Sequence, residues 1–306
     1  MKFICAQPAI EYYTWQVEVM INNFIKKGIN PNNIEIVCGY SKEIPESWKT
    51  LASHYNTVRF FFYKDERFKP GYISSIRPHV LYKHWLSNPE LENETIFYHD
   101  CDIVFSKALD FTEMLKDDVC YVSDTVSYIG AKYIRSKGEH YFDLMTDIVN
   151  VNKQYVIANE ENSGGAQYLI KNVSAEFWKK VYYDSESLFR IVTNQIKKDN
   201  PPHALQIWCA DMWAVLWNLW FFDKIVKVSK DLSFSWATSP ISEWDKHYIF
   251  HNAGVTGDRK DLFHKGSYMS KLPYDDVEVQ AFNTNFCSFN YVQEIKKTKQ
   301  ISCLTK

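Results

Sequence analysis

Short apolar runs alternate with amphipathic segments through the first 125 residues of this chain. The predicted strands cover residues 3–6, 34–38 and 58–63, and the predicted helices cover residues 11–27 and 74–86. Gly28 and the pair Asn88-Pro89 supply the two helix stops. This alternation predicts an α/β fold with an open, mostly parallel sheet flanked by helices. Ligands of such a sheet bind at the carboxyl ends of its strands.

Two acidic residues, Asp100 and Asp102, lie inside the apolar run of residues 95–105. The run predicts a buried strand, and burying an unpaired carboxylate is unfavourable. Two neighbouring carboxylates also repel each other. A divalent cation between them, or a position at the end of the strand facing a ligand, removes both costs. Oxygen ligands favour Mg²⁺ or Mn²⁺. The alternative interpretation is an ordinary, solvated pair of aspartates at a strand end.

A histidine near the C-terminus could complete such a metal site. His251 follows the short apolar run Tyr248-Ile249-Phe250 and precedes a turn at Gly254, so it is placed as a third ligand. A lone histidine is more often a hydrogen-bonded structural residue. Downstream, Lys265 and nearby glycines could wrap a phosphate, or they could form a solvated charged loop.

Two further segments carry polar residues suited to a substrate. The loop of residues 161–168 contains Asn162, Ser163 and Gln167, which can hydrogen-bond to hydroxyl groups, or it is a polar turn before a strand. The predicted helix of residues 206–222 has Trp208 on its apolar face and Asp211 as its only charged residue. Asp211 is therefore either a functional residue facing a cavity or a partner in a structural ion pair.

Composition excludes some classes of function. The net charge of −2 gives no bulk attraction to nucleic acid. The seven cysteines are odd in number, lie mostly in apolar runs and include no Cys-x-x-Cys pair, which predicts a reduced, cytoplasmic protein. No linker interrupts the chain, so residues 1–291 are predicted to form one domain. Residues 292–306, with four lysines, are predicted to be a mobile tail, with peripheral membrane contact as the alternative.

Taken together and in this order, the motifs resemble those of GT-A-fold glycosyltransferases. The resemblance is strongest to glycosyltransferase family 8, the retaining family that includes glycogenin and bacterial galactosyltransferases. The matching positions are the Asp-x-Asp strand at residues 98–105, Asn162-Ser163-Gly164, Asp211-Met212, His251 to Gly254, and an upstream helix arginine at Arg77. Met212 replaces the glutamine of the family, and the lysine that follows its His-x-x-Gly motif is displaced here, with Lys265 as the candidate.

The resemblance implies a metal-dependent transfer of a sugar from a nucleoside-diphosphate sugar, with uridine as the expected base. The acceptor would be a hydroxyl of a glycan, a lipid-linked saccharide or a protein. Asp100, Asp102 and His251 would hold Mn²⁺ or Mg²⁺. The residues implied to contact the nucleotide sugar are Ala6, Gln7, Pro8, Tyr12, Arg77, Asp100, Ser163, Gly254 and Lys265. The residues implied to surround the sugar and the acceptor hydroxyl are Asp211, Asn162 and Gln167.

The resemblance also implies a nucleotide-binding half at residues 1–125 and an acceptor-side half at residues 126–291. It implies retention of configuration, for which no protein base is required. If the reaction inverts, Asp211 is the first candidate for the base.

Two other functions compete with this interpretation. Phosphatases of the haloacid-dehalogenase type also use Asp-x-Asp, but they need a threonine two residues after the second aspartate, where this chain has Val104. A non-catalytic sugar- or nucleotide-binding module of the same fold is the second alternative. Such a module has no physical need for the buried acids Asp100 and Asp102.

Overall fold

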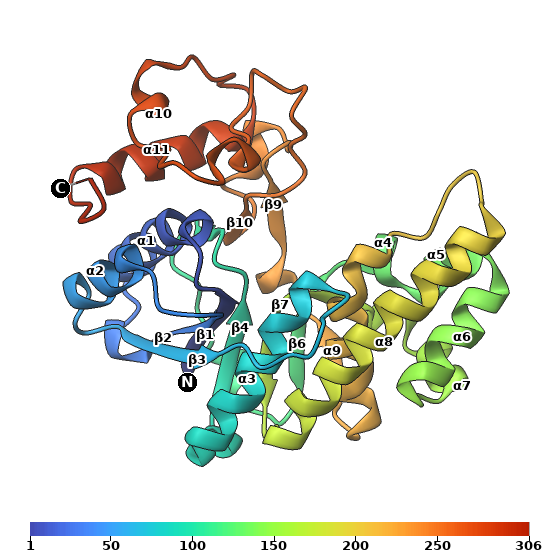
Figure 1. Cartoon of the computed structure of the whole chain (residues 1–306). Coiled ribbons are helices and arrows are strands. Elements are labelled where there is room, and N and C mark those ends of the chain that lie inside the picture. Colours follow the sequence, from blue (N-terminus) through green and yellow to red (C-terminus); the bar gives the residue numbers. More distant parts are fainter. Residues whose placement is uncertain (306) are drawn as a thin grey trace. The chain divides into compact units, whose positions relative to one another are not determined.

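The chain forms two compact units, each assembled from segments that are far apart in the sequence (Figure 1). A computed structural model describes residues 1–305, and residue 306 lies outside this description. Unit I comprises Lys2–Lys64, His99–Phe111 and Asp231–Lys306, and unit II comprises Met1, Asp65–Tyr98 and Thr112–Lys230. Both units include residues from either side of position 125, and the division into a nucleotide half and an acceptor half remains a prediction.

Unit I contains two groups of strands with helices around them. Its elements are β1 (Lys2–Pro8), α1 (Glu11–Lys26), β2 (Ile34–Tyr40), α2 (Glu46–His54), β3 (Arg59–Lys64), β5 (Ile103–Phe105), β9 (Phe234–Trp236), β10 (Ile249–His251), α10 (Asp276–Val279) and α11 (Cys287–Lys299). The first group runs in the order β3-β2-β1, with both pairs parallel. In the second group, β5-β10-β9, β10 is antiparallel to β5 and parallel to β9.

The core of unit I joins the first helix to the last one. Trp15 and Val19 of α1 belong to the same buried cluster as Tyr291 and Ile295 of α11. The α1 helix begins with Glu11, whose negative charge suits the positive end of the helix dipole, and Gly28 follows its end at φ +90°. This packing holds α1, and with it Tyr12, in a fixed position within the unit.

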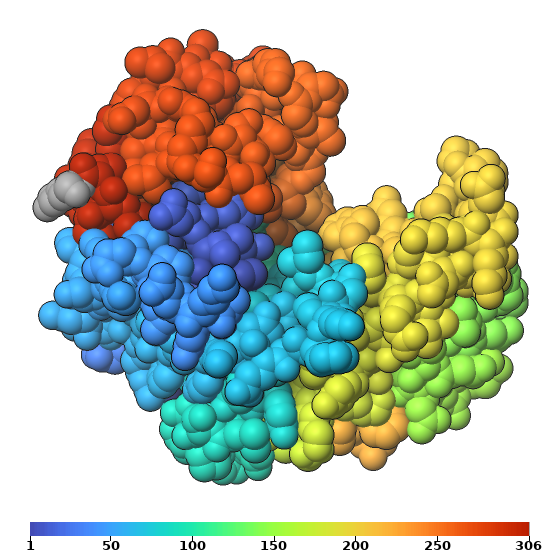
Figure 2. Space-filling model, in the orientation of Figure 1, coloured from blue at the N-terminus to red at the C-terminus, as the bar shows by residue number. Residues whose placement is uncertain are grey.

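The prediction of a mobile tail is wrong for the described residues. Helix α11 continues to Lys299, and the next residues pack against the N-terminal part of unit I, where Figure 2 shows dark red surface beside blue. Ser302 Oγ and the Cys303 N–H donate hydrogen bonds to the buried carboxylate of Glu18 at 2.7 and 3.0 Å. The prediction gave weight to the lysines of this segment and overlooked its apolar residues, which recur at helical spacing and form the buried face of α11.

Those lysines also have acidic partners. The pairs are Lys296–Glu278, Lys297–Glu294 and Lys299–Asp275. The fourth lysine, at position 306, lies outside the described residues. Membrane contact by this segment remains a prediction, and three of the charges on which it rests are already paired within unit I.

Unit II combines four strands with most of the helices. Its elements are α3 (Ile76–Ser87), β4 (Thr95–His99), β6 (Cys120–Asp124), α4 (Val126–Ile129), α5 (Ala131–Lys137), α6 (Glu139–Val149), α7 (Lys153–Ala158), β7 (Gly164–Lys171), α8 (Ala175–Asp199), α9 (Ala210–Phe221) and β8 (Val226–Val228). The strand order is β4-β7-β6-β8, with β6 antiparallel to β7 and parallel to β8. Helix α8 packs against both α3 and α9 (Figure 1). Ser174 caps α8 by accepting a hydrogen bond from the Phe177 N–H.

The predicted α/β class, with mostly parallel strands flanked by helices, is confirmed. Two predicted elements differ in detail. The run of residues 95–105 forms two strands, β4 and β5, and the Asp-x-Asp residues lie in the turn between them. Helix α9 begins at Ala210, so Trp208 precedes it and is 61% exposed instead of packed on its apolar face. Within residues 1–305, none of the helices has both the length and the apolar character needed to cross a bilayer.

Candidate metal and substrate site

The pairing of two short strands in unit I brings three candidate metal ligands together. In the antiparallel pair β5–β10, His251 lies opposite Ile103, the residue that directly follows Asp102. The backbone N–H of Asn252 donates to the Asp102 carbonyl at 3.0 Å, which fixes this register at the turn. Two strands that are far apart in the sequence therefore place the histidine beside the Asp-x-Asp turn.

The three side chains have the spacing of a metal site. His251 Nε2 lies 3.5 Å from Asp100 Oδ2 and 3.4 Å from Asp102 Oδ1. One ligand atom from each of Asp100, Asp102 and His251 falls within a group whose members are all within 4.8 Å of one another. The Asp102 and His251 side chains are buried, whereas Asp100 is 29% exposed. A cation held here would be fixed by protein on one side and open to a ligand on the other.

Two aromatic residues of β9 hold the imidazole of His251. The Trp236 ring stacks on it at 5.6 Å with an interplanar angle of 17°, and the Phe234 ring lies at 5.6 Å with an angle of 55°. Sequence reasoning missed both residues. Their signal was their spacing of two, which places them on one face of a strand.

The backbone of the Asp-x-Asp turn has a supporting histidine. His99 Nδ1 lies 2.9 Å from the Asp100 carbonyl oxygen, which can only accept, so this nitrogen carries the proton. Burial lowers the pKa of His99 to about 4, so the ring is neutral near pH 7. A neutral His99 holds the turn without adding positive charge beside Asp100.

Lys265 lies beside this cluster and contacts one of its carboxylates, while its contact with a phosphate stays a prediction. Its Nζ donates to Asp102 Oδ2. Burial alone would raise the pKa of Asp102, but Lys265 and His251 lower it well below its usual range. Burial also disfavours the charged form of Lys265, yet the adjacent Asp102 raises the lysine pKa above its ordinary value. Tyr12 is close enough to feel both charges, and burial raises its pKa to about 12.

The other residues predicted to contact the nucleotide in unit I lie at the end of β1 and after β10. Ala6 and Gln7 are buried near the carboxyl end of β1, and Pro8 is its last residue. Gln7 Nε2 donates to Cys38 Sγ at 3.1 Å, while its Oε1 has no partner among the described residues. Gly254 has a φ of +84°, which favours glycine at this turn.

In unit II, the predicted residues Arg77 and Asp211 form an ion pair with each other. Arg77 donates to Asp211 Oδ2, and the hydroxyl of Tyr72 lies 2.7 Å from Asp211 Oδ1. Tyr72 also lies 2.6 Å from the Trp208 carbonyl oxygen and stacks on Phe189 at 4.7 Å. Sequence reasoning missed Tyr72, which no motif distinguishes from the other tyrosines. Arg77 thus donates to one oxygen of Asp211, and the single Tyr72 hydroxyl proton is shared between the other oxygen and the Trp208 carbonyl.

The predicted acceptor loop in unit II is held mostly by its own strands. Gln167 Oε1 accepts from Ser123 Oγ at 2.7 Å, and Asn162 Oδ1 accepts from the Val228 N–H at 3.4 Å. Ser163 Oγ and Gln167 Nε2 are buried without a partner in the described part of the chain. A Cβ on Gly164 would lie only 2.4 Å from the Ser123 carbonyl oxygen. The absence of a side chain at Gly164 therefore allows strand β6 to lie this close.

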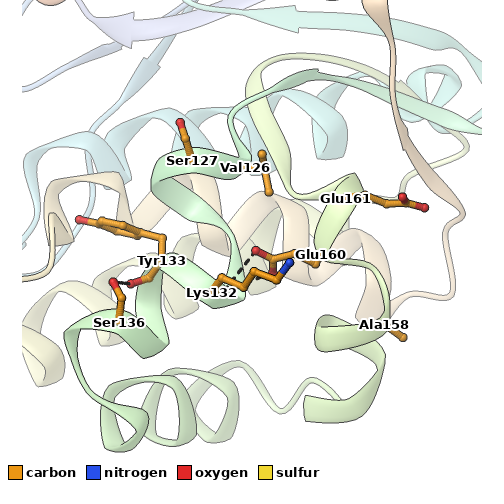
Figure 3. Close-up of a pocket in the computed structure, with 8 residues that line it drawn as sticks. All are labelled: Val126, Ser127, Lys132, Tyr133, Ser136, Ala158, Glu160 and Glu161. Atoms are coloured by element: carbon orange, nitrogen blue, oxygen red, sulfur yellow. Dashed lines mark hydrogen bonds between the residues drawn. The ribbon is translucent and has the colours of Figure 1, made fainter.

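A cavity of about 810 Å³ lies next to this loop, on the helical side of unit II (Figure 3). Both carboxylate oxygens of Glu160 accept from the Lys132 N–H at the start of α5, at 3.2 and 3.3 Å (Figure 3). The side chains that line the cavity are mainly polar: Val126, Ser127, Lys132, Tyr133, Ser136, Ala158, Glu160 and Glu161. None of the predicted catalytic residues lines it.

Comparison with solved structures identifies the fold. The bifunctional glycosyltransferase WbbM matches over 99% of this chain with a TM-score of 0.50 and 13% identity, and this chain spans 52% of the WbbM chain. The galactosyltransferase LgtC matches over 97% of this chain and 96% of its own, with a TM-score of 0.45 and 11% identity. The glycosyltransferase GlyE of Streptococcus pneumoniae matches over 99% of this chain and 63% of its own, with a TM-score of 0.45 and 10% identity.

At these identities the likeness establishes the fold, which is the GT-A fold predicted from the motifs. No protein-family profile matches the chain. No curated protein matches it either.

Proposed function

We propose that this protein is a metal-dependent glycosyltransferase that moves a sugar from a nucleoside-diphosphate sugar to a hydroxyl acceptor, with retention of configuration. The observation that supports the proposal is the convergence of Asp100, Asp102 and His251, whose ligand atoms lie within 4.8 Å of one another. The shared fold with glycosyltransferases supports it, and the resemblance to family 8 supplies uridine as the expected base.

The three side chains fit a divalent cation. Two carboxylates and one imidazole offer the ligands that Mn²⁺ accepts, and Mg²⁺ is the alternative among hard cations. Asp100, Asp102 and His251 would hold the ion, with Trp236 and Phe234 fixing the imidazole. When bound, the cation would neutralise the charge that develops on the leaving diphosphate.

The remaining residues of unit I would bind the donor. Lys265 carries a positive charge beside Asp102, and its ammonium group would bind the donor's diphosphate. Tyr12 keeps its proton at pH 7, because burial raises its pKa to about 12, so its hydroxyl can donate to a phosphate or a ribose. Ala6, Gln7 and Pro8 at the carboxyl end of β1 would contact the nucleoside through the backbone and the free Gln7 Oε1.

In unit II, Asp211 would orient a sugar hydroxyl. Because Arg77 donates to its Oδ2 and the Tyr72 hydroxyl lies beside its Oδ1, Asp211 is better suited to accept a hydrogen bond than to remove a proton. This arrangement favours retention, in which the departing phosphate assists the incoming hydroxyl and no protein base is needed. Asn162, Ser163 and Gln167 would supply further hydrogen bonds to the sugar and the acceptor.

A donor-hydrolysis and transfer assay tests this proposal. The protein is incubated with a panel of uridine- and guanosine-diphosphate sugars, with Mn²⁺ or with EDTA, and release of the nucleoside diphosphate is measured. We expect release from one class of donor only with the metal, and NMR of the product should show the donor's anomeric configuration. Equal release in EDTA would contradict the metal site, and an inverted product would reassign Asp211 as the base.

A further inference from the structure

Both carboxylate oxygens of Asp102 already have protein partners. Oδ1 lies 3.4 Å from His251 Nε2, and Oδ2 accepts from the ammonium group of Lys265. Asp102 is almost fully buried, with a side-chain exposure of 6%. Lys265 is therefore the close positive charge that balances this buried carboxylate.

A divalent cation and Lys265 have opposing requirements at Asp102. The cation needs the same carboxylate, and two positive charges within a few ångströms in a partly buried site repel each other strongly. Either the Lys265 side chain turns away from Asp102, or the cation binds despite repulsion from the Lys265 ammonium group. Binding of the metal alone is opposed in either case.

The geometry allows the side chain of Lys265 to move while its backbone stays in place. The neighbouring residue Phe263 is buried, and its N–H donates to Ser288 Oγ at 3.0 Å. Tyr268, at the end of the same turn, stacks on Phe263 at 5.2 Å. The Lys265 side chain itself is 31% exposed, so its four-carbon stem can turn toward solvent without disturbing the core.

A diphosphate beside the cation would give Lys265 a new anionic partner. Moving the ammonium group from Asp102 to a phosphate oxygen keeps the lysine paired and frees Asp102 for the cation. The metal and the diphosphate would then each strengthen the binding of the other, because the diphosphate removes the competitor of the metal.

We propose that Lys265 is a built-in competitor of the metal at Asp102, which makes binding of the cation and of the nucleoside diphosphate mutually dependent. The inference rests on the proposed function, since it concerns the same metal site. It predicts that the protein holds Mn²⁺ poorly by itself and well together with a nucleoside diphosphate.

Isothermal titration calorimetry with Mn²⁺ alone tests the competition directly. We compare the wild type, Lys265→Met, Lys265→Arg and the control Lys42→Met, which removes an exposed lysine of the same unit. Lys265→Met should bind Mn²⁺ at least about tenfold more tightly than the wild type. Lys265→Arg and Lys42→Met should resemble the wild type, because both keep a cation beside Asp102.

The titrations are then repeated with uridine diphosphate or guanosine diphosphate present. The nucleotide that binds should tighten Mn²⁺ binding by the wild type at least about tenfold, and by Lys265→Met much less. The rise in melting temperature on adding Mn²⁺ alone should be larger for Lys265→Met, which supplies a second readout that also reveals any folding defect. If Lys265→Met does not fold, Lys265→Gln takes its place.

The outcomes separate this inference from the proposed function. Equal Mn²⁺ affinity in the wild type and Lys265→Met would overturn the competition and leave the metal site intact. Absence of Mn²⁺ binding in every variant, with and without nucleotide, would overturn the metal site and the competition with it.

Discussion

Replacing Asp102 by asparagine removes one charge from the metal cluster and leaves the side-chain volume almost unchanged. Loss of a group that only supports a ligand typically weakens metal binding 10–100-fold. Asp102 is a direct ligand candidate, 3.4 Å from His251 Nε2 and nearly buried, so its loss should cost more. We expect the dissociation constant for Mn²⁺ in the presence of nucleotide to rise at least about 100-fold, or about 2.7 kcal/mol.

The same substitution should affect stability only modestly when the metal is chelated. Breaking a buried ion pair costs about 3–5 kcal/mol when the remaining charge stays buried. Lys265 can reach water, and Asp100 loses a repulsive neighbour, so we expect a loss of about 1–2 kcal/mol in the free energy of unfolding.

The pH dependence of this loss has a defined sign. The pKa of Asp102 is lowered in the folded protein, so its stabilising contribution is present above the ordinary carboxyl pKa of about 4. That contribution fades as pH falls through the lowered value. The stability gap between wild type and variant should therefore be constant from about pH 5 to 8 and narrow below about pH 4.

The assay is calorimetric titration of Mn²⁺ together with urea unfolding in EDTA. Asp245→Asn is the control, because it changes an exposed aspartate of the same unit. Unchanged Mn²⁺ affinity in a folded Asp102→Asn variant would refute the assignment of Asp102 as a ligand. A stability gap that widens toward low pH would refute the reasoning about its charge.

Three further substitutions test other parts of the account. Trp236→Leu removes the ring stacked on His251 and should weaken Mn²⁺ binding about tenfold by calorimetry; an unchanged affinity would mean that β9 does not position this ligand. Tyr72→Phe removes the hydroxyl beside Asp211 and should lower kcat about tenfold without changing donor affinity; unchanged kcat would make that hydrogen bond purely structural. Ser302→Ala removes a donor to buried Glu18 and should lower the free energy of unfolding in urea by about 1.5–3 kcal/mol. The exposed control Ser270→Ala should change it little. Equal stability of the two variants would mean that residues 300–305 are not held by this hydrogen bond.

The sequence was most informative where a pattern is local. Alternating strands and helices identified the α/β class. Asp100 and Asp102 could be named because buried acids need a partner, and His251 because it follows a short apolar run and matches the His-x-x-Gly motif. Their contact could not be derived, since it depends on the register between β5 and β10, about 150 residues apart in the sequence.

Other features depend on tertiary packing and were missed or misread. Arg77 was expected to contact the donor, and only the folded chain reveals that it pairs with Asp211. The segment from Val292 was read as mobile because its lysines hid a buried helical face and because Glu18, its hydrogen-bond acceptor, lies at the other end of the chain. Neither Tyr72 nor Trp236 belongs to a motif, so only their neighbours in space mark them.

The most direct test of the central claim is a thermal-shift series with nucleoside diphosphates. Each nucleotide is added to the protein with Mn²⁺ and, separately, with EDTA, and the melting temperature is measured. The account predicts stabilisation by one nucleotide class only when Mn²⁺ is present, and loss of that shift in Asp102→Asn. Stabilisation that is equal in Mn²⁺ and EDTA, or no shift with any nucleotide, would contradict it.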